Sequence, residues 1–272
     1  MLDFTIEQVV TDRFSMEYIH FGTGKTPMVV LPGLGVKSVI ESAPAVVSHY
    51  RKFKSDFSVY VPERRSEIPQ DYDNAQMAKD TAQALKTLGL HHVCLFGVSQ
   101  GGMIAMLVTS AFPELVSCLS LCSTAMTMND ERFRVIRNWI RLAEHKDKEG
   151  LFLSFGKNIY PAPFFEQNRQ AFIEISKTVT DKELNRFVQL AKAIEGSDAS
   201  SVIGNIRCPV QLSFDENDTV LGKDPASEMR AHFSTLPQFE ERRFNGYGHA
   251  LYDTCPDFLE WLYRFFMRMK AS

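Results

Sequence analysis

Short runs of β-branched and aromatic residues recur along the chain and predict a series of strands. Residues 4–10 and 14–21 form the first two runs, which we expect to pair antiparallel. The later runs cover residues 28–31, 57–61, 92–96, 115–121, 210–214 and 239–244. Each run is only a few residues long, which is typical of strands rather than helices.

Segments with a helical period lie between these runs. Apolar residues recur at helical spacing from Ala78 to Leu88, and Gly89 follows as a typical helix stop. Similar patterns predict helices over residues 38–53, 101–112, 225–233 and 256–269. Strands that alternate with helices predict an α/β fold, with a mostly parallel, doubly wound sheet covered on both faces.

The alternation stops after residue 124 and resumes near residue 206. Helical patterns over residues 130–146, 164–177 and 181–195 occupy the interval. We therefore expect one core domain built from residues 1–124 and 206–272, with residues 125–205 inserted into it as a helical unit.

Composition narrows the classes of function. Hydrophobic residues make up 44% of the chain and charged residues 23%, as in ordinary globular proteins. The formal net charge is −3, and no basic face is visible. Because nucleic-acid binding depends on clustered lysine and arginine, we expect a small-molecule substrate and no nucleic-acid partner.

The cysteines and the most apolar segments indicate the cellular compartment in which we expect the protein. The chain has 5 cysteines, an odd number without a CxxC pair, which favours reduced thiols. Acidic residues near the start do not fit a secretion signal, and the most apolar window, residues 98–108, is too short for a membrane span. We expect a cytoplasmic protein with no membrane span; the oligomeric state stays open.

The glycines of "HFGTGKTPMVVLPGLGVKS" raise the alternative of a phosphate-binding loop. Such a loop needs GxxxxGK[ST], and Ile19 occupies the position of its first glycine. A strand-like run follows Thr26, where a phosphate loop would open a helix. The sequence therefore predicts no nucleotide cofactor, and no ligand cluster predicts a metal.

The strongest chemical motif is GxSxG in "VCLFGVSQGGMIAML". Gly97, Ser99 and Gly101 supply it, directly after a predicted strand and before a predicted helix. In this context the motif is typical of a nucleophile elbow, whose serine lies in a strained turn that only small neighbours permit.

A serine nucleophile needs a base, and the base needs an acid that orients it. His249 follows the last predicted strand in the glycine-flanked "FNGYGHALYD". Asp215, Glu216 and Asp218 follow the strand before it. The residues alone leave the choice of acid open.

With these motifs the whole chain resembles the α/β-hydrolase fold superfamily, in its form with a helical cap. The resemblance implies a catalytic triad of Ser99, Asp218 and His249, because "PVQLSFDEND" resembles the family pattern PVxxxxGxxD. Asp215 stands where that pattern has glycine. The resemblance also makes residues 125–205 the cap.

The same resemblance implies an oxyanion hole. One backbone N–H would come from Gln100, the residue after the nucleophile. The other would come from Leu34 in "PGLG", at the place where the family often has HGxG. These donors would stabilise the negative charge that acyl transfer develops on the carbonyl oxygen.

The sequence thus predicts a cofactor-free serine hydrolase of a carboxylic ester or thioester with a small to medium apolar substrate. Aromatic and methionine residues of the inserted segment are expected to be mostly core, with a minority facing substrate. Two alternatives stay open: a same-fold C–C bond hydrolase, enol-lactonase or perhydrolase, and a small-molecule receptor without turnover.

Overall fold

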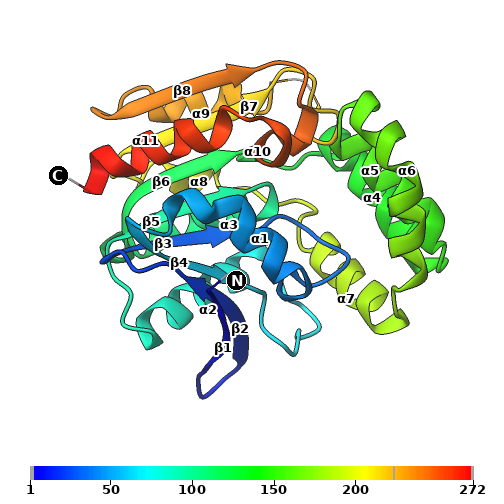
Figure 1. Cartoon of the computed structure of the whole chain (residues 1–272). Coiled ribbons are helices and arrows are strands. Elements are labelled where there is room, and N and C mark those ends of the chain that lie inside the picture. Colours follow the sequence, from blue (N-terminus) through cyan, green and yellow to red (C-terminus); the bar gives the residue numbers. More distant parts are fainter. Residues whose placement is uncertain (1–2, 223, 271–272) are drawn as a thin grey trace.

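A computed structural model describes residues 3–222 and 224–270 (Figure 1). The chain forms an 8-stranded sheet in the order β1-β2-β4-β3-β5-β6-β7-β8. The strands are β1 (Thr5–Val10), β2 (Ser15–Phe21), β3 (Thr26–Leu31), β4 (Phe57–Pro62), β5 (Val93–Val98), β6 (Val116–Cys122), β7 (Val210–Asp215) and β8 (Phe239–Phe244). The predicted α/β fold is confirmed, and every predicted strand is present.

The sheet is antiparallel at one edge and parallel elsewhere. β1 pairs antiparallel with β2 and β2 with β4, whereas β4, β3, β5, β6, β7 and β8 run parallel. The carboxyl ends of the parallel strands therefore meet at one edge, where open α/β sheets bind their ligands.

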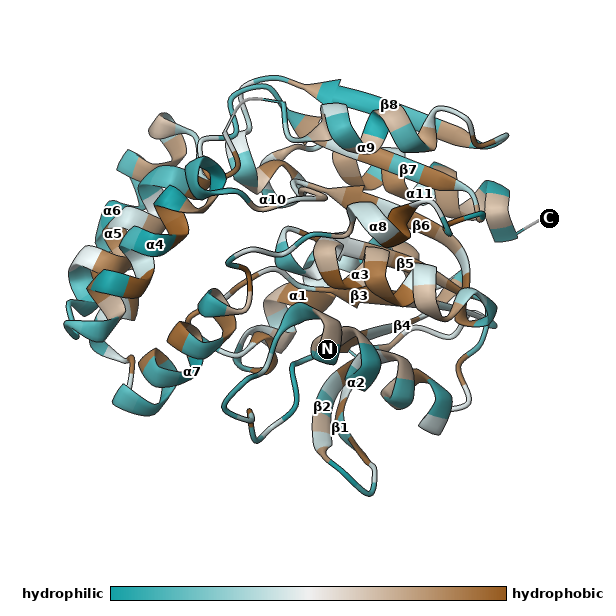
Figure 2. Ribbon diagram, turned by 180° about the vertical axis from the view of Figure 1, so that it is seen from behind, coloured by the Kyte–Doolittle hydropathy of each residue, from teal (hydrophilic) through white to brown (hydrophobic). Residues whose placement is uncertain are grey.

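Helices cover both faces of this sheet (Figures 1 and 2). One face packs against α1 (Ala43–His49) and α11 (Phe258–Lys270). The other packs against α2 (Asn74–Thr87), α3 (Gln100–Ala111), α8 (Ser200–Ile203) and α9 (Ala226–Phe233). Central strand β5 is buried at every position, whereas edge strand β8, "FEERRF", is hydrophilic (Figure 2). Burial on two faces explains why β5 reads as a continuous apolar run.

The helix predicted over residues 38–53 was wrong as one unit. The structure divides it into a 3₁₀ turn, Val39–Ser42, then α1, then a second 3₁₀ turn, Tyr50–Phe53. Pro44 lies in the first turn of α1. Proline has no N–H to donate and its ring clashes with the carbonyl four residues earlier, so a helix can begin at this point but cannot run through it.

Between β6 and β7 the chain forms a separate layer of helices beside the sheet (Figure 1). Its helices are α4 (Asp130–Glu144), α5 (Lys148–Ile159), α6 (Ala162–Lys177) and α7 (Asp181–Lys192). Of these, α4, α5 and α7 share an apolar core that includes Phe133, Trp139 and Phe187. The sequence pattern had not indicated α5. No helix among the described residues is both long enough and apolar enough to cross a membrane.

Candidate active site

Ser99 lies in the turn between β5 and α3, at the carboxyl edge of the sheet. Its φ of 51° and ψ of −120° fall in a backbone region that residues with a β-carbon rarely adopt. Ser99 N donates to Cys122 O at 3.0 Å, and Thr124 Oγ1 donates to Ser99 O at 2.7 Å. The end of β6 and the residues after it therefore hold the strained turn in place.

The glycines around Ser99 are required by close backbone contacts. A β-carbon on Gly97 would lie 2.6 Å from the carbonyl oxygen of Gly101. A β-carbon on Gly101 would lie 2.1 Å from Leu31 O, on the neighbouring strand. Any other residue at either position would displace the backbone, which explains the GxSxG spacing in physical terms.

His249 joins Ser99 to Asp218. His249 Nε2 is 3.0 Å from Ser99 Oγ, and His249 Nδ1 is 2.8 Å from Asp218 Oδ2. Both His249 and Asp218 are only 5% exposed. A carboxylate can only accept, so Nδ1–H donates to Asp218 and the neutral ring leaves Nε2 free to accept the serine proton. The structure thus brings the three predicted residues into one chain of hydrogen bonds.

Asp218 is itself fixed by the loop that carries it. Its other oxygen, Oδ1, accepts from Val220 N at 2.9 Å and from Leu221 N at 3.1 Å. These bonds satisfy the oxygen that does not face His249. These backbone donors fix the orientation of the buried carboxylate towards His249.

Asp215, the other candidate acid, has different partners. Its Oδ1 accepts from Asn217 N at 2.8 Å, and its Oδ2 accepts from Tyr247 N at 2.9 Å. It is 2% exposed, and the ring of His249 bonds to Ser99 and Asp218 instead. Asp215 therefore connects the loop after β7 to the loop that carries His249, as a structural bridge.

The glycine-rich loop after β3 lies against Ser99. A β-carbon on Gly33 would lie 3.2 Å from Ser99 Cβ. Gln100 is the first residue of α3, where a backbone N–H has no partner within the helix. Within the described ranges, neither Leu34 N nor Gln100 N donates to another protein group. Both N–H groups therefore lack a protein acceptor among the described residues.

Two cavities meet at Gly33. An apolar cavity of about 330 Å³ is lined by Val98, the residue before Ser99, and by residues of β3 and α1. A more polar cavity of about 270 Å³ is lined by Gln100, the residue after Ser99, and by Leu34 and Arg64. Pro32, Gly33 and Tyr252 contact both. The loop that packs against Ser99 through Gly33 therefore borders both cavities.

The side chain of Gln100 is completely buried. Its Nε2 donates to Leu190 O of α7 at 2.9 Å and to Asn74 Oδ1 of α2 at 3.1 Å. Gln100, the residue after Ser99, thus links the site to the helical layer. Sequence reasoning had considered only its backbone.

The aromatic residues of the inserted segment lie mainly in its own core. Phe133, Trp139 and Phe165 are at most 7% exposed, and none lines either cavity beside Gly33. The apolar lining comes instead from β3, α1 and Tyr252. Sequence reasoning missed Tyr252 and Arg64, because no motif distinguishes them from surface residues.

Comparison with known proteins gives the family. Residues 26–188 match the family profile described as the alpha/beta hydrolase fold. The chain is 24% identical over 193 residues to RutD of Escherichia coli, which carries a carbamate hydrolase name; the match covers 70% of this chain and 71% of RutD.

Solved structures agree with this fold. The alpha/beta hydrolase MGS-M2, from a Medee basin deep-sea metagenome library, superposes with a TM-score of 0.83 at 18% identity, over 96% of this chain and 97% of that one. A thermophilic esterase from Thermogutta terrifontis gives a TM-score of 0.76 at 18% identity, over 97% and 99%. The family profile covers more than half of the sequence, and the chain therefore belongs to the alpha/beta hydrolase fold family.

Proposed function

We propose that this hydrolase cleaves a carboxylic ester or thioester through an acyl-enzyme on Ser99. The observation that carries the proposal is the continuous chain from Ser99 Oγ through His249 to the buried Asp218, at 3.0 Å and 2.8 Å. A serine that is hydrogen-bonded to a base, whose base is held by an acid, is the arrangement that activates a hydroxyl nucleophile.

In the first half of the reaction, Ser99 Oγ attacks the carbonyl carbon and its proton passes to His249 Nε2. Asp218 stabilises the imidazolium that forms. When the tetrahedral intermediate collapses, the bond to the alcohol or thiol breaks and His249 returns the proton to the leaving group. The acyl group is then bound to Ser99 as an ester.

We assign the oxyanion hole to the N–H groups of Leu34 and Gln100. Neither donates to a protein group in the described part of the chain, and the loop that carries Leu34 lies against Ser99 through Gly33. Fixed backbone donors stabilise developing negative charge without having to reorganise. In the second half of the reaction, His249 takes a proton from water, the resulting nucleophile attacks the acyl-enzyme, and the free acid leaves.

We also propose that residues 125–205 act as the cap of this site. Helix α7 supports this role, because its Leu190 carbonyl accepts from Gln100 and its Arg186 lines the polar cavity. Substrate would bind between this helix and the carboxyl edge of the sheet, with its apolar part in the cavity beside Val98.

The test is Ser99→Ala in the purified protein. We expect the variant to lose hydrolysis of short and medium esters and to lose labelling by a fluorophosphonate, while its melting temperature stays close to that of the wild type. Unchanged ester hydrolysis in the variant would refute the proposal. Product analysis separates the alternatives: an acid and an alcohol indicate an esterase, and tight ligand binding without turnover indicates a receptor.

A further inference from the structure

Arg64 follows β4 and lines the polar cavity beside Gly33. It is only 6% exposed. Its guanidinium makes one hydrogen bond, from Nη2 to Pro32 O at 2.7 Å, and its buried Nε has no partner among the described residues. No carboxylate among them contacts this guanidinium. Burying a cation without a counter-charge is costly, so this arrangement indicates a site that a ligand completes.

Its neighbour Glu63 does not neutralise the guanidinium, because its carboxylate is engaged elsewhere. Glu63 Oε2 accepts from Ser38 Oγ at 2.8 Å and from Val39 N at 2.9 Å. Glu63 Oε1 accepts from the backbone N–H of Arg64 at 2.7 Å and lies 3.7 Å from Arg186 Nη2. Burial lowers the pKa of Arg64, while the charge of Glu63 opposes that shift.

The other two acids at this cavity are also paired. Lys37 Nζ lies 2.9 Å from Glu183 Oε1 and 2.9 Å from Glu41 Oε2. Glu183 is further engaged by Thr180 at the start of α7. Lys37 is therefore paired with two carboxylates, whereas the Arg64 guanidinium forms no ion pair with a described carboxylate.

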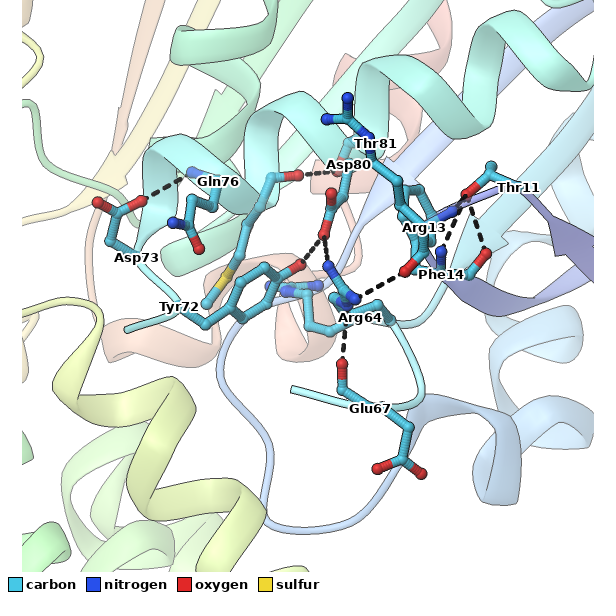
Figure 3. Close-up of polar contacts among 12 residues, drawn as sticks. Thr11, Arg13, Phe14, Arg64, Glu67, Tyr72, Asp73, Gln76, Asp80 and Thr81 are labelled. Carbon is cyan, nitrogen blue, oxygen red and sulfur yellow. Dashed lines mark hydrogen bonds and ion pairs between the residues drawn. The ribbon is translucent and has the colours of Figure 1, made fainter. Parts of the chain in front are cut away.

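The position of Arg64 is fixed by its surroundings. From α7, Arg186 donates to Arg64 O at 3.1 Å and to Arg65 O at 3.0 Å. The following residue, Arg65, donates to the carbonyls of Arg13 and Glu67 at 3.0 Å and 2.7 Å. Figure 3 shows the part of this network that joins the loop after β4 to the first hairpin and α2. The backbone at Arg64 is thus held by several hydrogen bonds, and its side chain is buried.

We infer that Arg64 binds a carboxylate of the substrate, so that the enzyme acts on esters that carry a free acid group. The inference rests on the proposed ester hydrolysis and adds the class of substrate. Arginine suits this role because its planar guanidinium forms strong, directional hydrogen bonds with carboxylates. Pro32, which Arg64 contacts, is adjacent to Gly33, and consecutive Cα atoms are about 3.8 Å apart. The acid group would therefore bind in the polar cavity that Gly33 borders, on the loop that packs against Ser99.

The experiment compares charged and neutral esters of matched length. Monobutyl glutarate carries the acid on the acyl side, with butyl hexanoate as its neutral match; 3-(hexanoyloxy)propanoate carries it on the alcohol side, with propyl hexanoate as its match. We expect the wild type to prefer the charged member of at least one pair. Arg64→Gln keeps a donor for Pro32 O but removes the charge. It should raise KM and lower kcat/KM for that ester at least tenfold, with the neutral ester changed less than threefold.

Two control variants sharpen the comparison. Arg64→Lys should restore part of the preference, because it restores the charge. Lys37→Gln removes the same unit of charge from the same cavity, and we expect it to change both esters less than threefold, since Lys37 is already paired. Equal losses on charged and neutral esters in Arg64→Gln, or no preference in the wild type, would overturn the inference and leave Arg64 as a support for the loop at Pro32.

A binding measurement keeps the inference testable apart from turnover and from the folding of Arg64 variants. Calorimetry with the Ser99→Ala protein should show glutarate binding at least tenfold more tightly than the neutral 1,5-pentanediol. Equal affinity for the two would contradict the role of Arg64 even if esters are hydrolysed. If glutarate binds but no ester is cleaved by the wild type, the proposed function fails and the carboxylate site stands.

Discussion

At the residue scale, the contacts of two neighbouring aspartates differ in kind. One carboxylate oxygen of Asp218 accepts a hydrogen bond from His249, and the other accepts from two backbone N–H groups. Both carboxylate oxygens of Asp215 accept hydrogen bonds from backbone N–H groups. The first arrangement can orient a histidine and stabilise its charged form, whereas the second can only hold two loops together.

We therefore expect Asp218→Asn and Asp215→Asn to have opposite signatures. Asp218→Asn should lower kcat on the order of 10⁴-fold with little change in stability, because an amide favours the wrong imidazole tautomer. Asp215→Asn should lower kcat less than about tenfold but destabilise the fold by about 1–3 kcal/mol, because a buried N–H loses its acceptor. Ester kinetics and urea unfolding of both variants measure the two effects. The reverse pattern would transfer the acid role to Asp215.

The sequence could predict Ser99, His249 and the loop of the acid, because each follows a strand at the same edge of a parallel sheet. The choice of Asp218 over Asp215 depended on the family resemblance. It could not predict Arg64. An arginine beside a strand end is usually a surface residue, and only the contacts of Glu63 and Pro32 in the folded chain show that this one is buried without a counter-charge.

At the element scale, the strands were predictable and some helices were not. A short apolar run is enough to identify a buried strand in the sequence. Helix α5, "KEGLFLSFGKNI", lacked a clear apolar stripe and contains Gly150 and Gly156, which favour other conformations. Gly156 is explained by packing: a β-carbon there would lie 2.7 Å from the ring of Phe165 on α6. The reason for the glycine therefore lies in a neighbouring helix.

The start of α7 provides a prediction about pH. Thr180 and Glu183 form a capping box, and Lys37 contacts the same carboxylate. Burial alone would raise the pKa of Glu183, but the hydrogen bonds from Thr180 and Lys37 outweigh it and lower the pKa to about 2. Because the pKa is depressed in the folded state, the ionised carboxylate stabilises the fold above its ordinary pKa, about 4.3.

Glu183→Gln should therefore be less stable than the wild type at pH 7. This difference should shrink as the pH falls from about 4.3 towards 2, where Glu183 loses its charge in the folded state as well. Urea unfolding of both proteins from pH 7 to pH 3 measures it. A difference that does not change over this range would show that the charge of Glu183 contributes nothing to holding α7.

At the scale of the whole molecule, the topology concentrates the chemistry. β3, β5, β7 and β8 run parallel, so the loops that follow them meet at one edge of the sheet. Those loops carry Gly33, Ser99, Asp218 and His249. The helical layer between β6 and β7 reaches the same edge through α7. A single sheet edge thus carries Ser99, His249 and Asp218, and the Gly33 loop that borders both cavities.

The apolar cavity leads to a prediction about the length of the acyl chain in the substrate. The apolar cavity of about 330 Å³ is lined by valines of β3, α1 and β5 together with Tyr50 and Tyr252. Each buried methylene contributes about 0.8 kcal/mol, so hexanoate could gain up to about 3 kcal/mol over acetate. We expect kcat/KM for ethyl hexanoate to exceed that for ethyl acetate at least tenfold.

Val46→Trp tests whether this cavity is the cause, because the larger ring would fill space that the chain needs. It should lower kcat/KM for ethyl hexanoate at least tenfold and leave ethyl acetate within about threefold, since acetate does not extend past Gly33. Val10→Trp is the matched control: Val10 is 64% exposed at the end of β1, and its substitution should change neither ester. If Val46→Trp lowers both rates equally, the chain binds elsewhere, and the polar cavity beside Arg64 becomes the place to look for it.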